Sequence, residues 1–144
     1  MERVDGNVNY LCFNYLTGDV LYARLRPYLN KVLYAEPDGV CSTEFHLMRV
    51  NSADVLSEYL AAIMRSKIIV AQTKHMMTGN THPRISNDDV KNLRIPIPPL
   101  DTQRTIVNDM RQRIANARQL KREAEFEWVA AKELFEQELM GELK

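Results

Sequence analysis

The chain has 144 residues, of which 45% are hydrophobic and 26% charged, and its formal net charge is zero. This composition is typical of a folded globular domain and excludes a disordered chain. No apolar run approaches the roughly 18 residues of a membrane-spanning helix. DNA-binding proteins that act alone usually carry a basic excess, because phosphate contacts dominate their affinity. Zero net charge therefore favours a module of a larger assembly, and the lack of a signal-peptide pattern predicts a cytoplasmic location.

Residues 1–98 predict an α+β domain with a small core. Turn signals at Thr17–Asp19 and Pro37–Gly39 bound runs that are rich in Val, Leu and aromatic residues. Pro27 interrupts the first of these runs. The expected strands cover residues 20–25, 31–35 and 45–50, and Phe45, Leu47 and Arg49 share one face of the third.

Three helices are expected after the third strand. Ser52 or Asp54 can cap the first and Ser86 the third, because short polar side chains accept the unpaired N–H groups of a first helical turn. Gly79 is expected to end the second helix, although residues 68–70 of that segment would also suit a strand. Apolar periodicity places the three helices at about 55–64, 67–77 and 87–93.

The chain changes character after three prolines at positions 96, 98 and 99, which stiffen it into an extended link. From Thr102 to Leu143 there is no proline and a single glycine, which predicts a continuous helix of 42 residues. At about 1.5 Å per residue its length is roughly 63 Å. Such a helix cannot fold back over a small domain and is expected to need a partner. The expected boundaries are 1–98 for the compact domain and 99–144 for the helical segment.

Apolar residues recur along this helix with a mean spacing of about 3.67, nearer to an eleven-residue repeat than to a heptad, which predicts a nearly straight pairing of helices. Small alanines at mid-helix allow close approach of a partner. The alternative, a helix packed along its own domain, is disfavoured by its length. The predicted pairing seam consists of Ile106, Met110, Ile114, Ala117, Leu120, Ala124, Trp128, Ala131, Phe135 and Leu139.

Charge is distributed unevenly along the same helix. Residues 104–122 hold six cations and one acid, a net charge of +5, whereas residues 123–144 hold seven glutamates and two lysines, a net charge of −5. This order opposes the helix dipole, which favours anions near the N-terminal end. Antiparallel packing of two such helices places opposite charges together, whereas parallel packing places like charges together. The pattern predicts an antiparallel pair; a solvated charged surface is the alternative.

Catalytic motifs are missing from the sequence. There is no Gly-rich phosphate loop and no Asn-Pro-Pro-Tyr box of a methyltransferase. Asp38 and Glu44 are faintly similar to the acid pair of a nuclease, but His46 stands where lysine is usual. A turn followed by a strand explains these residues equally well, so we expect no catalytic site.

Candidate metal ligands are equally sparse. His46, His75 and His82 lack metal-ligand spacing to one another or to cysteine, and Cys12 and Cys41 suggest neither a zinc site nor a disulfide framework. Ordinary half-buried histidines and thiols are the simpler interpretation. We expect neither a metal nor a cofactor.

Polar and basic side chains gather beside two predicted turns. Arginine can read guanine, asparagine can read adenine, and threonine can contact either base or a phosphate. Ordinary polarity of a surface loop would explain the same composition. The candidate DNA contacts are Arg24, Arg26 and Lys31 around Pro27, and Lys74, Asn80, Thr81, His82 and Arg84 in and before the loop 78–86.

Four stretches of the chain stand out together: GDVLYARLRPYLNKV (18–32), CSTEFHLMRV (41–50), TGNTHPRIS (78–86) and, above all, RIPIPPLDTQRTIV (94–107). In combination they resemble the specificity (S) subunit of type I restriction–modification systems. The resemblance covers residues 18–143, and its most specific part is the proline-rich stretch that leads into a long helix.

The resemblance implies two target-recognition domains in a full S subunit, each followed by a long helix. The helices pack antiparallel, and each domain reads one half of a split DNA target. It also implies methylation (M) subunits, which transfer methyl groups from S-adenosylmethionine to adenine, and restriction (R) subunits, which translocate and cleave DNA. This chain has one such domain and one helix, and its domain is short before Gly18. We therefore expect a fragment or a half-size subunit.

The expected function is recognition of double-stranded DNA by a non-catalytic subunit of a type I restriction–modification complex. Its expected partners are M and R subunits and, through the helix, a second copy or a second S half. Two other classes stay open: a coiled-coil scaffold without DNA recognition, which suits the neutral charge, and an enzyme, which the missing motifs disfavour. Salt-dependent DNA binding separates the first two.

Overall fold

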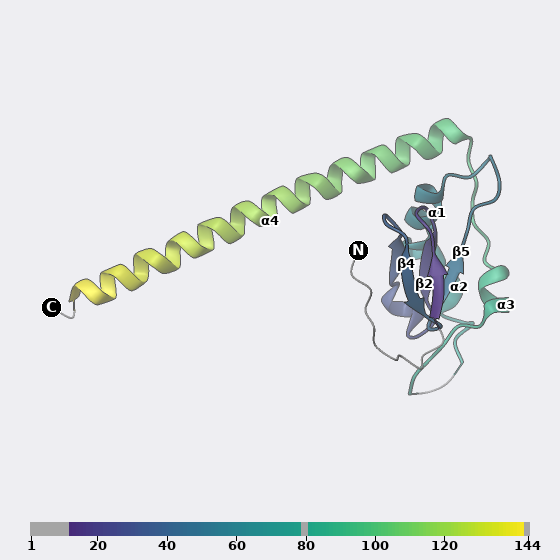
Figure 1. Ribbon diagram of the computed structural model, residues 1–144, viewed down its shortest axis with the longest axis horizontal. Coiled ribbons are helices and arrows are strands. Elements are labelled where there is room, and N and C mark those ends of the chain that lie inside the picture. The colour runs from purple at the N-terminus through teal and green to yellow at the C-terminus, as the bar shows by residue number, and fades with distance from the viewer. Residues whose placement is uncertain (1–11, 79–80, 143–144) are drawn as a thin grey trace. The chain divides into compact units, whose positions relative to one another are not determined.

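The computed structural model describes residues 12–78 and 81–142. The chain divides into two compact units, a first unit of Met1–Arg104 and a second unit of Thr105–Lys144. Strands and short helices make up the described part of the first unit, and the second is helical (Figure 1). The expected α+β class with a long C-terminal helix is therefore confirmed.

A three-stranded antiparallel sheet forms the centre of the first unit. Strand β2 (Val20–Ala23) lies between β3 (Val32–Tyr34) and β5 (Phe45–Met48), and all four of its residues are buried. Tyr22 is paired with Val32 on one side and with His46 on the other. These are the three strands that the sequence predicts, each shorter than expected.

Strands β1 (Cys12–Tyr15) and β4 (Gly39–Ser42) form a second, two-stranded antiparallel sheet, in which Phe13 pairs with Cys41. The sequence analysis did not predict either strand, and it was wrong to include Gly39 in a turn, since this residue begins β4. Most side chains of the two strands are exposed. Their sequences, CFNY and GVCS, lack the alternation of apolar and polar residues that marks a half-buried strand.

Three short helices follow β5: α1 (Ser57–Met64), α2 (Lys67–Thr73) and α3 (Asn87–Lys91). The caps predicted for α1 are wrong, because its N-cap position is Leu56 and no side chain of the neighbouring residues caps it. Ser52 instead accepts a hydrogen bond from the Asp54 backbone N–H at 3.1 Å within a local turn. The N–H of Leu56 donates to Gln103 Oε1 at 2.9 Å, so a residue 47 positions away supplies the acceptor.

The segment that the sequence left open between helix and strand is helical. Helix α2 buries Ile69 and Thr73 and ends at Thr73, whereas Gly79, expected to end it, lies outside the described residues. The cap predicted for α3 is confirmed, since Ser86 Oγ accepts the Asp89 N–H at 3.1 Å and Asp89 accepts the Ser86 N–H at 3.1 Å. Both hydrogen bonds satisfy N–H groups at the start of the helix.

The core of the first unit is a buried cluster of Tyr22, Met64, Ile69 and Ile85, which joins the sheet to α1 and α2. His46 stacks on Tyr22 with the ring centroids 6.3 Å apart. The buried face of β5 therefore carries His46, rather than the face shared by Phe45 and Leu47. This histidine belongs to the protein interior, as the simpler interpretation of the sequence held.

A buried carboxylate holds the turn before β2. Asp19 is 2% exposed and accepts hydrogen bonds from Arg49 Nε and Nη2 at 2.8 and 2.6 Å and from the Leu16 N–H at 2.8 Å. Gly18 precedes it with a φ of 90°, a conformation that glycine adopts without strain. The Arg49 guanidinium is the main cause of a lowered pKa for Asp19, against the opposing effect of burial.

Asp19→Asn is expected to lower the free energy of unfolding by about 2 kcal/mol at pH 7, the magnitude typical of hydrogen bonds to charged groups. Because the folded state lowers the pKa of Asp19, its contribution is complete above the unfolded value of about 3.9 and is lost as pH falls through the lower, folded value. Urea unfolding of both proteins between pH 7 and pH 2 should show the difference shrinking below about pH 5. Asp88→Asn, on an exposed carboxylate, is the control, and a pH-independent difference would contradict the assignment.

Helix α4 (Leu100–Glu142) contains 43 residues and confirms the predicted long helix, which begins two residues earlier than expected. Its first turn belongs to the first unit. There Gln103 is fully buried and donates hydrogen bonds to the carbonyl oxygens of Asp54 and Pro98 at 2.7 and 2.8 Å. Over the residues that the structure describes, none of the helices combines the length and apolar character that crossing a membrane requires.

Candidate nucleic-acid interface

The two polar segments singled out in the sequence lie side by side. Leu25 and Arg84 form an antiparallel β-bridge, flanked by hydrogen bonds from the Arg26 N–H to the Pro83 carbonyl at 2.8 Å and from the Ile85 N–H to the Arg24 carbonyl at 3.1 Å. A second bridge, between Thr78 and Arg84, closes the loop on itself. Residues almost 60 positions apart thus form one continuous surface, which we call the paired-loop surface.

Arg26 has an unusual backbone conformation on this surface. Its φ of 52° and ψ of 60° are left-handed, and so is Asn30 at the other end of the short 3-10 helix Pro27–Leu29. This conformation costs a residue with a Cβ roughly 1–2 kcal/mol. Backbone hydrogen bonds from Arg26 to Pro83 and from Leu29 to Arg26 hold it. Strain of this kind is concentrated at functional positions, and the side chain of Arg26 is exposed.

Arg84 is the best-placed cation of the loop. Its side chain is 57% exposed, and its Nη2 lies 3.0 Å from Oε1 of Glu44, in the turn before β5. An exposed pair of this kind contributes little to stability, at most about 1 kcal/mol. Glu44 therefore orients Arg84 at small energetic cost and leaves its remaining N–H groups available to a ligand.

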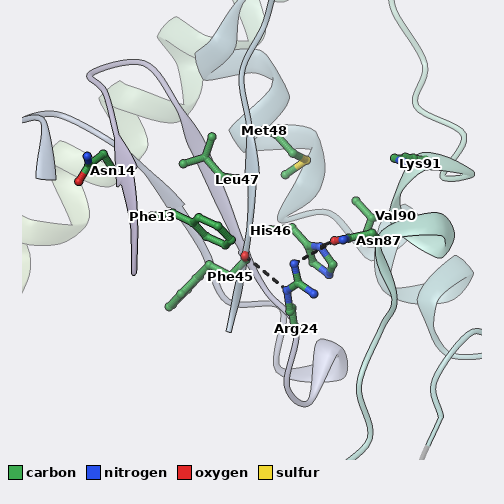
Figure 2. Close-up of a pocket in the computed structure, with 10 residues that line it drawn as sticks. All are labelled: Phe13, Asn14, Arg24, Phe45, His46, Leu47, Met48, Asn87, Val90 and Lys91. Carbon is green, nitrogen blue, oxygen red and sulfur yellow. Dashed lines mark hydrogen bonds between the residues drawn. The ribbon is translucent and has the colours of Figure 1, made fainter. Parts of the chain in front are cut away.

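Arg24 is the least exposed of the candidate cations, because it is held by a network that the sequence did not reveal. Its Nη2 donates to Asn87 Oδ1 at 3.0 Å, and its Nε lies 3.5 Å from the Phe45 carbonyl oxygen (Figure 2). Asn87 Oδ1 also lies 2.8 Å from His46 Nδ1, and His46 Nε2 lies 3.2 Å from the Ile85 carbonyl. Burial and the nearby Arg24 charge lower the pKa of His46, which favours a neutral imidazole.

The other candidate residues are exposed and make fewer contacts. Lys74 follows the last residue of α2, Lys31 precedes β3, and Thr81 and His82 lie in the loop. Asn80 lies outside the described residues. The structure therefore brings Arg24, Arg26 and Arg84 together on the paired-loop surface, with Lys31 and Lys74 on the segments that flank it.

Sequence reasoning missed Asn87, considered Glu44 only as half of an acid pair, and gave His46 no role beside Arg24. Asn87 follows the Ser86 cap, and only its position in a helical first turn could be predicted. Its partner Arg24 is 63 residues away, a separation over which no local pattern operates. Glu44 and Arg84 are 40 positions apart, so no local pattern predicts their pairing either.

No arrangement typical of a metal site or an acid pair appears in the described part of the chain. No three His, Cys, Asp or Glu side chains come close enough there to hold a metal ion. Asp38 accepts hydrogen bonds from the N–H and hydroxyl of Thr17 at 2.6 and 2.8 Å, which lower its pKa, and Glu44 is paired with Arg84. Both carboxylates therefore have structural partners, and the two cysteines are free thiols.

The predicted pairing seam of α4 is an exposed surface in this single chain. Ile114, Trp128 and Phe135 are 41%, 64% and 61% exposed, values that are high for large apolar side chains. Charged residues on the same helix pair locally, as Arg113 does with Asp109 at 2.9 Å. The exposed apolar residues of this amphipathic helix are therefore available to pack against a partner.

Comparison with known proteins connects these features to a family. The family model described as "Type I restriction modification DNA specificity domain" matches residues 3–125. The chain is 30% identical over 103 residues to the type I restriction enzyme EcoDI specificity subunit of Escherichia coli, covering 72% of the chain and 22% of that protein. It is 31% identical over 96 residues to the HindI specificity subunit of Haemophilus influenzae, covering 63% of the chain and 21% of that protein.

Solved structures give the same result. The HsdS subunit from Thermoanaerobacter tengcongensis superposes with a TM-score of 0.64 and 37% identity over 75% of this chain and 29% of its own. A chain solved to explain complex assembly and conformational transition of a type I R-M system gives a TM-score of 0.63 and 36% identity over 77% of this chain and 30% of its own. The chain thus spans less than a third of the length of these relatives.

Proposed function

Because this chain belongs to the family of type I restriction modification DNA specificity domains, we propose that it recognises DNA sequence and leaves catalysis to partner subunits. The observation that carries the proposal is the Leu25–Arg84 bridge, which joins two polar segments into one surface. That surface presents arginines beside exposed Lys31 and Lys74. Arginine can bind guanine edges or phosphates in the grooves of double-stranded DNA.

Partners follow from the same proposal. The chain would act in the cytoplasm with methylation and restriction subunits, and the recognition domain and helical spacer would correspond to residues 1–98 and 99–144. Helix α4 would pair antiparallel with the helix of a second copy or of a second S half. Its exposed seam and the opposite charges of residues 104–122 and 123–144 support this arrangement.

A scaffold that pairs through α4 without reading DNA is the second candidate, and the zero net charge favours it. Salt dependence separates the two. For a DNA-binding protein, the logarithm of the binding constant falls linearly with the logarithm of salt concentration, because phosphate contacts displace counterions. A scaffold would show no sequence-dependent DNA binding at any salt concentration.

The direct test compares DNA binding by Arg84→Ala, Arg26→Gly and the unaltered chain, each assembled with its methylation subunits. The target is first selected from a random pool with the unaltered assembly. Loss of one well-placed arginine contact is expected to weaken discrimination between target and scrambled DNA by about 5- to 150-fold, since such contacts contribute roughly 1–3 kcal/mol. Arg118→Ala, on an exposed cation of α4, is the matched control.

Arg26→Gly separates the loss of a contact from damage to the fold. Glycine adopts the left-handed conformation of residue 26 without strain, so the melting temperature of this variant should not fall while its DNA discrimination does. Unchanged discrimination in both variants would show that the paired-loop surface does not read DNA.

A further inference from the structure

A cleft of about 430 Å³ opens between β1, β5 and α3. The apolar part of its wall includes Phe13 and Met48, and the polar part includes Arg24, His46 and Asn87. In Figure 2 the Phe13 ring faces the side chains of His46, Asn87 and Arg24. The volume falls within the range typical of small-molecule sites, and an apolar wall with a few converging polar groups is typical of their lining.

Hydrogen bonds within the protein fix the polar side chains of the cleft in the absence of a ligand. Asn87 Oδ1 is occupied, since it accepts from Arg24 Nη2 at 3.0 Å and lies 2.8 Å from His46 Nδ1. These contacts determine which way the amide is turned. Asn87 Nδ2 makes no hydrogen bond to the residues that the structure describes, so it remains as a donor for a ligand. His46 is 5% exposed and also lines the cleft.

The aromatic wall offers a matching apolar surface. Phe13 is 43% exposed, although it is a large hydrophobic residue in a β-strand. A flat ring could stack on it and still present a polar edge to Asn87. Two cations line the cleft: Arg24, and the exposed Lys91, which lies 3.7 Å from Asp88.

A second cleft, of about 510 Å³, adjoins the first, because Phe13 and Arg24 line both. Its other lining residues include Glu44, Thr78 and Arg84. The first cleft therefore lies beside the paired-loop surface, to which the proposed function assigns DNA binding. A nucleotide turned out of a DNA duplex bound to that surface would therefore lie close to the first cleft.

We propose that the cleft binds one unpaired nucleobase, stacked on Phe13 and accepting a hydrogen bond from Asn87 Nδ2. Nucleobases combine apolar faces with an edge of acceptors and donors, and a stacked base is recognised in this way elsewhere. Since the proposal rests on the proposed function, the base would come from DNA bound to the paired-loop surface. A free nucleotide has the same chemistry and is the second possible source.

The test uses the chain assembled with its methylation subunits and two fluorescent duplexes of the selected target that differ only by one unpaired adenine. The bulged duplex is expected to bind about tenfold more tightly than the paired duplex, a typical gain for stacking on one aromatic ring. Phe13→Ala and Asn87→Asp should abolish that preference. Asn87→Asp keeps an oxygen acceptor for Arg24 and His46 and replaces the donor Nδ2 by a second, charged acceptor. The paired duplex, measured with the same variant, is the reference for the effect of the added charge. Phe126→Ala, on an exposed ring of α4, is the matched control.

Free nucleoside monophosphates form the second arm, measured by saturation-transfer NMR with the same variants. Binding of these nucleotides that Phe13→Ala abolishes, without a preference for the bulge, would assign the cleft to a free nucleotide. Two results would overturn the cleft proposal. One is the absence of both a preference for the bulged duplex and nucleotide binding, and the other is binding that both variants leave unchanged. If the paired duplex binds in an Arg84-dependent way while the cleft variants change nothing, only the cleft proposal fails. If no duplex binds, the proposed function fails and the nucleotide arm still decides the cleft.

Discussion

Gln103→Glu is expected to lower the free energy of unfolding of the first unit by about 2–4 kcal/mol. The fully buried amide donates to the carbonyl oxygens of Asp54 and Pro98 and accepts from the Leu56 N–H. A carboxylate cannot donate, so its buried charge would face two carbonyl oxygens at hydrogen-bonding distance. Such an unsatisfied buried group carries the full desolvation penalty.

Differential scanning calorimetry measures this effect. For a unit of about 100 residues, each kcal/mol lowers the melting temperature by roughly 4–8 °C. Gln112→Glu is the matched control, because it makes the same chemical change on an exposed position of the same helix. Equal melting temperatures for the two variants would show that Gln103 does not hold the first turn of α4 against residues 54–56.

Trp128→Glu is expected to weaken self-association through α4 by about 100-fold or more. Trp128 is 64% exposed in the single chain and stands on the predicted seam, and buried tryptophans are the commonest energetic centres of interfaces. A glutamate there would bury a charge among apolar side chains of the partner.

Light scattering between about 1 and 100 μM would measure the association, because an interface of roughly 8 kcal/mol gives micromolar affinity. Phe126→Glu is the matched control: residue 126 is 73% exposed, and two positions along a helix turn it about 200° away from the seam. A monomer at 100 μM would refute pairing of two copies. Greater weakening by Phe126→Glu than by Trp128→Glu would place the interface on another face.

The long helix shows how far local sequence information reaches. The absence of proline and the single glycine near the end predicted a helix over 102–143, and the structure has one over 100–142. The Ser86 cap was predictable for the same reason, since its hydrogen-bonding partner is three residues away. The resemblance carried by RIPIPPLDTQRTIV was also confirmed. The eight candidate DNA contacts and the pairing seam stay predictions, which the variants above test.

Elements that depend on distant partners were missed. Strands β1 and β4 are exposed on most side chains and exist through their pairing with each other. The acceptor for the Leu56 N–H comes from Gln103, so inspection of residues 52–54 suggested the wrong cap. Sequence patterns report side-chain periodicity and local hydrogen bonding, and neither contains information about a group 47 positions away.

The amino-acid sequence was sufficient to predict the class of the fold, the length of α4 and the polar character of two loops, because each depends on neighbouring residues and on backbone preferences. The folded structure was needed to show that these loops form one surface, that Asn87 holds Arg24, and that a cleft lies beside Phe13. The physical reason is the same in each case. The contacts join segments that approach only when the sheet and its helices pack, and that packing depends on the whole first unit.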